Sequence, residues 1–270
     1  SNAALAQTAN EQDDTSVQET VIITGTRGAP RTAFDSLAPV DVISEKAIDL
    51  TASDEVMDTL SQLVPSFNVK RLPMADGQVF VRPASLRSLS ADHTLVLING
   101  KRMHRSALLG SNGAQAPDLA QIPSYAIKQI EVLRDGAAAQ YGSDAIAGVI
   151  NIVLKEGAGK GLASISAGTT AEGDGDTYGA SAWRGFALGE WGGFASLAVE
   201  GRRRGETNRA GVDTLRVDPP RVTQRIGDSL ARDAYLWTNA VLPMGGGELY
   251  LFGGASKRTG DAAGFFRPKD

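Results

Sequence analysis

The stretch Ile130–Leu154, IEVLRDGAAAQYGSDAIAGVINIVL, decides the fold of the first half of the chain. Residues 129–133 alternate apolar and polar side chains, and residues 149–154 are mostly β-branched and apolar, so each run predicts a strand. We expect the second strand to be the more buried one. Small residues between the strands let backbones pass closely, which suits a tightly enclosed domain. The glycines that punctuate this connection are Gly136, Gly142 and Gly148.

Further short elements precede this stretch. Strands are predicted at residues 40–43, 67–70, 79–82 and 94–98, the last followed by Asn99-Gly100, a strong signal for a tight turn. Ser53 is a candidate cap for a helix with apolar residues at helical spacing, which Pro65 ends. Residues 28–156 are therefore predicted to form an α+β domain, a small mixed sheet with short helices.

The N-terminal region has two parts of different composition. Residues 1–18 are polar and acidic and predict a disordered tail. Residues 19–27, ETVIITGTR, form a β-branched run at the end of this tether, which suits pairing with an exposed strand of another protein. An ordinary first strand of the domain's own sheet is the alternative.

Residues 157–270 have a different pattern. Long segments with partial alternation recur at residues 162–170, 177–188, 193–202, 233–242 and 248–258. Short connections alternate with longer ones, as in barrels of the bacterial outer membrane. The pattern predicts antiparallel strands of a transmembrane β-barrel. Five strands cannot close such a barrel, so we expect it to be truncated.

Aromatic residues in these segments have two interpretations. They are either part of aromatic girdles at the membrane interfaces or pack between strands. The residues are Trp183, Trp191, Tyr235, Trp237 and Tyr250.

The bulk composition excludes several classes of protein. The chain of 270 residues has no cysteine, so it has neither disulfides nor thiolate metal sites. Its formal net charge of −4 gives no electrostatic footprint for nucleic acid. No run of about 18 apolar residues predicts a membrane-spanning helix.

Chemical motifs are equally sparse. The two histidines, His93 and His104, lack the spacing of a zinc motif, and no nucleophile elbow, P-loop or dinucleotide fingerprint is present. We therefore expect no metal site, no cofactor and no enzyme activity.

The opening stretch, taken with RPASLR at residues 82–87 and LVLINGKR at residues 95–102, resembles the plug domain of TonB-dependent outer-membrane receptors. The family's usual Arg-Gly pair appears here as Arg87-Ser88, which puts the geometry of that turn in doubt. The resemblance implies that residues 19–27 are the TonB box. Its expected TonB contacts are Glu19, Thr20, Val21, Ile22, Ile23, Thr24 and Gly25.

The resemblance also implies a function. Receptors of this family take a scarce large solute across the bacterial outer membrane, with the plug facing the periplasm. The implied partners are TonB with ExbB and ExbD, outer-membrane lipid and the transported ligand. Substrates in the family include iron chelates bound to siderophores, haem, cobalamin and carbohydrates, and the sequence does not choose among them. The alternative is a non-transporting module for ligand binding or adhesion with a plug-like fold.

Two sets of site residues follow from the resemblance. Plug arginines of the family pair with carboxylates of the barrel, and by position Arg87 and Arg134 are the candidates for this lock, with solvent-facing strand-end arginines as the alternative. Ligand contacts are expected from two outward loops, although solvated loop residues would look the same. The candidates are Arg71, Met74, Met103, His104, Arg105 and Asn112.

Overall fold

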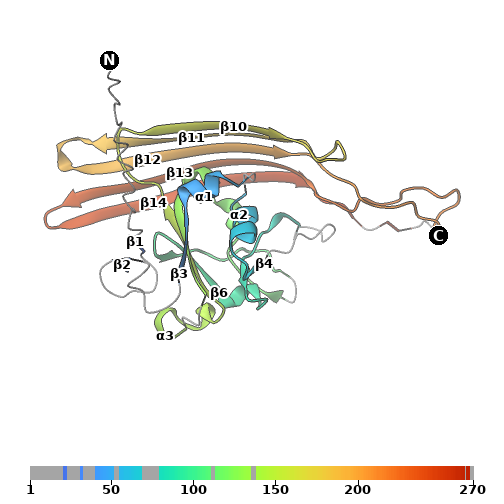
Figure 1. Cartoon of the computed structure of the whole chain (residues 1–270), viewed down its shortest axis with the longest axis horizontal. Coiled ribbons are helices and arrows are strands. Elements are labelled where there is room, and N and C mark those ends of the chain that lie inside the picture. The colour runs from blue at the N-terminus through green and yellow to red at the C-terminus, as the bar shows by residue number, and fades with distance from the viewer. Residues whose placement is uncertain are drawn as a thin grey trace, which may run out of the picture.

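The computed structural model describes residues 21–22, 31–32, 40–51, 55–68, 79–110, 113–134, 138–264 and 266–267. An N-terminal domain of mixed α and β structure packs against one face of a sheet of long strands, called the wall here (Figure 1). The strands of the wall run along the longest axis of the molecule, and the domain lies beneath their middle.

A five-stranded mixed sheet forms the centre of the N-terminal domain. Its order is β3-β8-β9-β6-β7, with β6 parallel to β9 and the other neighbours antiparallel. Among the described strands, β3 therefore lies at an edge of the sheet and pairs with β8 alone. The bounds are β3 (Val40–Ser44), β6 (Thr94–Ile98), β7 (Lys101–Arg102), β8 (Ile127–Leu133) and β9 (Gly148–Leu154).

Short helices and two small strand pairs complete the domain. The helix α1 begins where the Ser44 hydroxyl accepts a hydrogen bond from the backbone N–H of Ala47, at 3.3 Å. The helices are α1 (Glu45–Asp49), α2 (Val56–Leu63) and α3 (Ala138–Tyr141), with 3-10 turns η3 (Ala91–His93), η5 (Leu119–Gln121), η6 (Ser124–Ala126) and η7 (Ser143–Ala145). The pairs are β1 (Val21–Ile22) with β2 (Arg31–Thr32), and β4 (Phe67–Asn68) with β5 (Ser85–Leu86).

Burial in the sheet follows the sequence pattern. Every residue of β9 is buried, whereas β8 leaves Lys128 exposed, so the second strand is the more buried one, as predicted. Side chains from β8 and β9 pack with those of α2 in one apolar core. The largest fully buried apolar side chains are Met57, Leu60, Leu86, Leu119, Ile122, Ile127, Ile130, Ile150, Ile152 and Leu154.

The local predictions have mixed outcomes. The strand at residues 94–98 is confirmed as β6, and the turn after it is confirmed by the positive φ of Asn99 (47°) and Gly100 (76°). The predicted strand at residues 79–82 is wrong. A 3-10 turn occupies residues 79–80, and the Arg82 N–H donates to the Asp118 carboxylate at 2.9 Å rather than to a neighbouring strand. Ser53 lies outside the described residues.

Arg87 and Ser88 form an unusual turn after β5. Both have φ of 58°, in the left-handed region that residues with a Cβ seldom adopt. The family's glycine at the second position would take this conformation without steric cost. A serine therefore occupies a strained position in this turn.

The wall consists of five antiparallel strands in sequence order, so the predicted segments are confirmed as strands. Short connections at residues 189–192 and 245–246 lie at one end, and longer ones at residues 169–176 and 205–229 lie at the other (Figure 1). The bounds are β10 (Gly161–Gly168), β11 (Thr177–Leu188), β12 (Gly193–Arg204), β13 (Leu230–Met244) and β14 (Gly247–Asp261), with the 3-10 turn η8 (Gly189–Trp191) between β11 and β12.

The two faces of the wall differ in chemistry. The face turned to the N-terminal domain buries Trp183, Tyr235 and Trp237, so these three pack inward and the girdle interpretation is wrong for them. Alternate residues point to the other face. Leu197 and Leu236 there are exposed and apolar. None of the helices in the described ranges has the length and apolar character needed to cross a membrane.

Gly148 is predicted to be irreplaceable at the start of β9. Its φ is 142°, and a Cβ there would lie 2.4 Å from the Leu133 carbonyl oxygen. We expect Gly148→Ala to destabilise the domain by about 2–4 kcal/mol through strain and overlap. Gly157→Ala is the matched control, because Gly157 also has a positive φ (105°) but no atom within 4 Å of the added Cβ. Hydrogen exchange of the β8 and β9 amides measures the difference, and equal protection in both variants would contradict the overlap.

Candidate functional site: the polar interface between the domain and the wall

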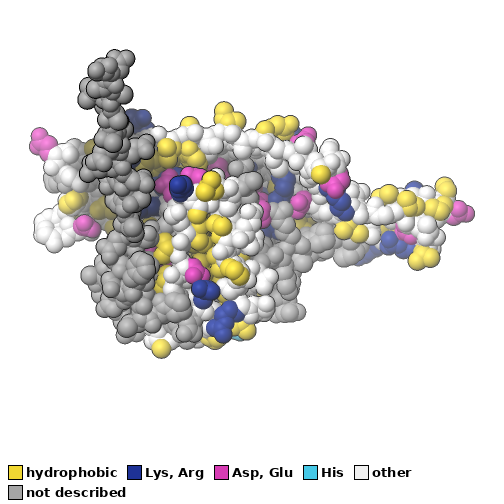
Figure 2. Space-filling view, viewed as in Figure 1, with side chains coloured by type: hydrophobic (Ala, Val, Ile, Leu, Met, Phe, Trp, Pro, Cys, Tyr) yellow, Lys and Arg dark blue, Asp and Glu magenta, His cyan; other side chains and the backbone are white. Residues whose placement is uncertain are grey.

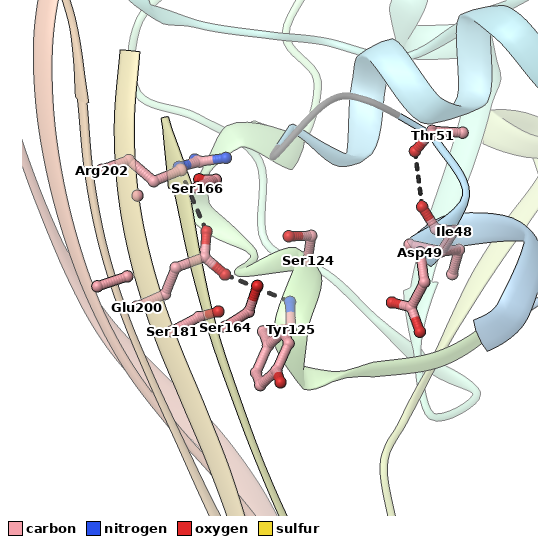
Figure 3. A pocket seen from close by; sticks show the side chains of 12 residues that line it. Ile48, Asp49, Thr51, Ser124, Tyr125, Ser164, Ser166, Ser181, Glu200 and Arg202 are labelled. Carbon is pink, nitrogen blue, oxygen red and sulfur yellow. Dashed lines mark hydrogen bonds and ion pairs between the residues drawn. The ribbon is translucent and has the colours of Figure 1, made fainter. Parts of the chain in front are cut away.

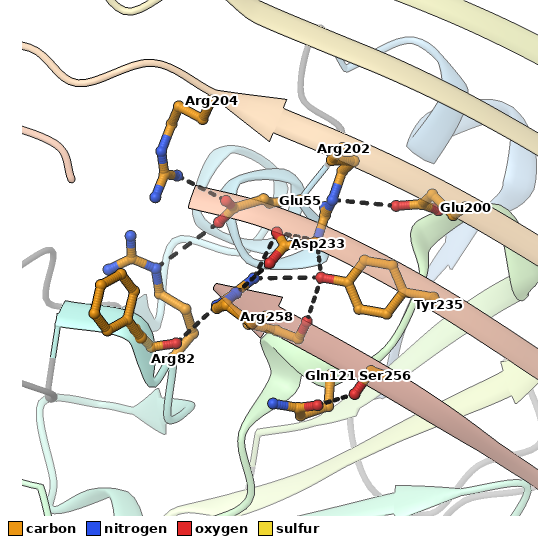
Figure 4. Close-up of polar contacts among 12 residues, drawn as sticks. Glu55, Arg82, Gln121, Glu200, Arg202, Arg204, Asp233, Tyr235, Ser256 and Arg258 are labelled. Carbon is orange, nitrogen blue, oxygen red and sulfur yellow. Dashed lines mark hydrogen bonds and ion pairs between the residues drawn. The ribbon is translucent and has the colours of Figure 1, made fainter. Parts of the chain in front are cut away.

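The N-terminal domain and the wall meet through buried charged side chains. Alternation along β12 turns Glu200, Arg202 and Arg204 toward the domain, and strand register brings Asp233 opposite Arg202. The cluster is completed by residues of β14 and of the domain (Figure 4). Its members, called the charge cluster here, are Glu55, Arg82, Glu200, Arg202, Arg204, Asp233 and Arg258.

Ion pairs within the wall form the inner part of the charge cluster. Arg258 binds Asp233 through two parallel contacts, Nε to Oδ1 at 2.5 Å and Nη2 to Oδ2 at 3.0 Å. Arg202 lies 3.3 Å from Glu200 and 3.6 Å from Asp233, and its guanidinium lies over the ring of Tyr235. These pairs compensate the charge of two buried arginines within the wall.

Other contacts cross from the wall to the domain. Arg204 Nη1 lies 2.8 Å from Oε1 of Glu55, and Arg82 Nε lies 3.8 Å from the other oxygen of the same carboxylate. Arg258 Nη1 donates to the carbonyl of Phe80 at 2.7 Å, and the Tyr235 hydroxyl donates to the carbonyl of Ala120 at 2.8 Å. The domain is therefore held by directional polar contacts in addition to apolar packing.

A second anchor lies where the domain's chain enters the wall. The carbonyl of Lys155 accepts hydrogen bonds from Ser196 (3.4 Å) and Asn239 (3.2 Å) of the wall. The buried ammonium group of Lys155 lies 3.0 Å from the carboxylate of Glu45, at the start of α1, and 4.5 Å from the ring centroid of Tyr125. Lys155 thus connects α1 and the wall through two different groups.

A small polar cavity separates α1 from the wall (Figure 3). Its volume is about 110 Å³, room for a few waters at about 30 Å³ each. Ile48, Asp49 and Thr51 line one side of it. The wall side carries Ser164, Ser166, Ser181, Glu200 and Arg202, and Ser124 and Tyr125 lie between the two sides. Burial raises the pKa of the Tyr125 phenol, and the carboxylates of Asp49 and Glu45 raise it further.

The longer connections of the wall are joined by a polar clasp. Arg209 binds Asp174 through two contacts of 2.7 and 2.9 Å and also lies 3.0 Å from Glu172. Hydrogen bonds from Arg209, and then from Thr170, hold the pKa of Asp174 well below the usual carboxyl range. Acidic and basic side chains lie together on this projecting end (Figure 2). A shallow, open hollow lies beside the clasp, lined by residues of both longer connections and of the segment after β14.

Comparison with known proteins gives the family. Residues 32–149 match the family model "TonB-dependent Receptor Plug Domain". The chain is 32% identical over 160 residues to "Vitamin B12 transporter BtuB" of Photobacterium profundum, a match covering 59% of this chain and 24% of that protein. The N-terminal domain belongs to the family of plug domains of TonB-dependent receptors.

Solved structures agree on the fold. A mutant of the ferric enterobactin receptor from Pseudomonas aeruginosa aligns with a TM-score of 0.66 at 23% identity, covering 83% of this chain and 33% of that one. The ferric citrate transporter FecA, in its unliganded form, aligns at 0.61 and 16%, covering 85% and 32%. The chain spans about a quarter of the length of the curated relatives and about a third of these structures. The N-terminal domain is the plug domain, and the wall corresponds to the first strands of a barrel.

Arg87 and Arg134, which are predicted to lock the plug domain to the barrel, do not belong to the charge cluster. Arg134 pairs with Asp41 of β3 at 2.7 Å, within the plug domain. Arg87 is exposed, and its side chain forms no hydrogen bond or ion pair with any described residue of the wall. The lock formed by the described strands uses Arg82, Glu55 and the wall arginines instead. Pairing of Arg87 and Arg134 with other strands of the barrel stays a prediction.

The predicted binding residues are only partly described. Met103 is buried in the core, whereas His104 and Arg105 are exposed, and Arg105 lies 3.8 Å from Asp144. Val21 and Ile22 of the predicted TonB box form β1, paired with β2. Among the described residues no group of side chains could hold a metal ion. The other predicted residues lie outside the described residues: Arg71, Met74, Asn112, Glu19, Thr20, Ile23, Thr24 and Gly25.

Sequence reasoning missed the charge cluster, although β12 carried a signal for it. Glu200, Arg202 and Arg204 occur at every second position, opposite to exposed apolar residues of the same strand. Charges on one face of a strand with an apolar second face predict a polar partner on the charged side.

We predict that Asp233→Asn loosens the plug domain. The change leaves Arg258 and Arg202 buried with one carboxylate fewer, and breaking such a pair costs about 3–5 kcal/mol. Heat-induced unfolding of the full-length receptor in detergent measures this loss. Asp261→Asn, at an exposed position at the end of β14, is the matched control and should melt like the unchanged protein. An unchanged melting temperature for Asp233→Asn would contradict the structural role of the cluster.

The clasp predicts a pH dependence of the longer connections. Because the pKa of Asp174 is lowered by the fold, its contribution is fully present above the ordinary carboxyl pKa and is lost as pH falls through the lowered value. Proteolysis of residues 205–229 should therefore be equally slow at pH 7 and pH 5. Asp174→Asn should be cut faster at both values, and a cleavage rate for the variant equal to that of the parent would argue against the clasp.

Proposed function

We propose that the chain is the plug domain and first barrel strands of a transporter that takes a scarce large solute across the bacterial outer membrane. The observation that carries the proposal is the docking of a plug domain on the charged inner face of a wall whose outer face is apolar. An apolar outer face suits lipid, and a polar inner face suits an aqueous passage that the plug closes.

TonB is the proposed energy-coupling partner, together with ExbB and ExbD. The strand β1 belongs to the proposed box, Glu19 to Gly25, and TonB would add to this segment as a strand. Outer-membrane barrels have short turns on the periplasmic side. In Figure 1, β1 and β2 lie toward the end of the wall with the short turns, which supports a plug domain facing the periplasm.

The proposed cargo is an iron chelate, haem, cobalamin or a carbohydrate. Relatives named for vitamin B12 and for ferric enterobactin support a large, scarce solute as the class. His104 and Arg105 are exposed and keep their proposed role as ligand contacts. The other proposed contacts are Arg71, Met74 and Asn112, whereas the burial of Met103 in the core speaks against its predicted role.

Coupling to TonB is tested with a peptide. The purified periplasmic domain of TonB should bind a peptide of residues 12–31, and Ile22→Pro should abolish binding, because proline removes a backbone donor needed for strand addition. Thr15→Pro, in the tail before the proposed box, is the matched control and should bind like the parent. A peptide that TonB ignores, with TonB competent on another receptor's box, would favour a non-transporting binding module.

A further inference from the structure

Three basic side chains gather on the outer face of the wall, which is the face turned away from the plug domain. Each of them is the sequence neighbour of a member of the charge cluster, and successive residues of a strand point to opposite faces. Because the charge cluster lies on the inner face, these three side chains point outward, and all of them are exposed. They are called the basic patch here: Arg203 of β12, Arg232 of β13 and Lys257 of β14.

The register of the wall brings the basic patch together. Arg203 lies directly opposite Arg232. Lys257 is paired with Ala234, so it is a diagonal neighbour of Arg232 on the next strand. Side chains at such positions have Cβ atoms about 5 Å apart when directly opposite and about 7–8 Å apart on the diagonal, and like charges directly opposite each other are destabilising. The three cations therefore repel one another unless an anion lies between them.

The described part of the chain does not supply that anion. The charged groups of the basic patch form no hydrogen bond or ion pair with any described residue. By contrast, Arg216 in the longer connection pairs with Asp213 at 2.6 Å. Asp261 is the one carboxylate on the outer face of the five described wall strands, and it forms no ion pair with Arg232, its diagonal neighbour. The outer face thus carries an excess of positive charge at this level.

An apolar band begins directly beside the basic patch. Outward positions of β13 from Ala234 to Leu242 are apolar apart from Thr238, and Arg232 is the next outward residue after them. A tilted strand of a membrane barrel crosses the hydrocarbon layer in about 9–11 residues, which is close to the length of this stretch. The basic patch therefore lies where the hydrocarbon layer ends.

Two further observations place this boundary. Tyr178 of β11 lies directly opposite Arg203 and is exposed on the same face, and tyrosine is enriched at membrane interfaces. The strands end just beyond this level in the longer connections (Figure 1). Outer-membrane barrels have their longer loops on the extracellular side, so the basic patch lies at the level of the head groups of the outer leaflet.

We propose that the basic patch binds the phosphate groups of lipid A, the phosphorylated and acylated glucosamine disaccharide that anchors lipopolysaccharide in the outer leaflet. The inference rests on the outer-membrane location in the proposed function. An arginine fork donates parallel hydrogen bonds to phosphate oxygens, and lysine adds a point charge. The acyl chains lie along exposed apolar side chains of the band, among them Ile165, Val199 and Leu236.

Bound lipid A has a physical effect on the wall. Its phosphates neutralise cations that otherwise repel each other across β12 and β13. The basic patch alternates along the strands with the charge cluster, so the lipid stabilises the wall from outside at the level where the plug domain is bound inside. Arginine and lysine stems lie along apolar surface while their charged ends reach the head group.

Lipid binding by the full-length receptor in a non-ionic detergent tests the proposal, with purified lipid A as the probe. Arg232→Gln should weaken binding about fivefold, and Arg203→Gln/Arg232→Gln should weaken it more than tenfold, because each cation near a phosphate layer adds a similar factor. Arg232→Lys keeps the charge and should recover most of the affinity. Arg184→Gln is the matched control: Arg184 is also exposed and outward, but it lies about 20 Å further along β11 than Tyr178. Its affinity should equal that of the parent.

Other lipids identify the group that is recognised. Dephosphorylated lipid A should bind the parent at least tenfold more weakly, and undiminished binding would assign the affinity to the acyl chains and overturn the proposal. Phosphatidylglycerol should bind more weakly than lipid A and lose little affinity in Arg232→Gln. Equal binding of both lipids, with equal loss in the variant, would show a site for any anionic lipid rather than for lipid A.

Melting temperatures separate lipid binding from a structural role of the arginines. Without lipid A, Arg203→Gln/Arg232→Gln should melt at or above the temperature of the parent, because a repulsion has been removed. Added lipid A should raise the melting temperature of the parent more than that of this variant. A variant that melts lower without lipid, or that gains as much from lipid A as the parent does, would contradict the proposal.

Cell fractionation separates the failure of this inference from that of the proposed function. A full-length receptor found outside the outer-membrane fraction would overturn the proposed function, and the lipid A site with it. A receptor found in the outer membrane whose parent, Arg232→Gln and Arg184→Gln forms bind lipid A equally would overturn the lipid A site alone.

Discussion

Largely buried arginines of the wall set the main constraint on this structure. Removing a charged group from water costs several kcal/mol per ion, so each arginine needs a carboxylate or equivalent acceptors nearby. The wall supplies two carboxylates, Glu200 and Asp233, for its three arginines in the charge cluster. Arg204 takes Glu55 of the plug domain, and Arg258 takes the Phe80 carbonyl in addition to Asp233. The plug domain thus helps to cover these arginines and also supplies acceptors for two of them.

The parts of the fold that the sequence predicts well are those whose causes are local. The strands β6 and β9 follow from apolar runs, and the turn at Asn99-Gly100 follows from the ease with which these residues adopt positive φ. The helix α1 was not predicted, because five residues are too few for a helical period and only the Ser44 cap marks its start. The segment Val79–Arg82 has the pattern of a strand but pairs with no described strand, and the backbone N–H of Arg82 donates to the Asp118 carboxylate instead.

The lock could not be predicted from the sequence in the same way, because its partners are far apart in the chain. Glu55 and Arg204 are separated by 149 positions, and Phe80 and Arg258 by 178. Arg134 was chosen by its place at a strand end, yet its partner, Asp41, lies in the adjacent strand of the same sheet. Sequence alternation gives the face on which a charge lies, whereas its partner depends on how two domains meet.

Glu45 and Glu55 differ in their exposure to solvent, so the ion pair of Glu45 is weaker than those of Glu55. Glu45 is 39% exposed in its pair with Lys155, so water competes with that contact, and exposed pairs contribute little. Glu55 is 15% exposed and is shared by Arg204, which is 18% exposed, and by the buried Arg82, so both arginines would lose a carboxylate in a largely dry environment without it. Breaking a buried pair costs far more than breaking an exposed one. Lys155 is bound to the wall through its carbonyl and to Glu45 through its ammonium group, so this one residue connects α1 to the wall.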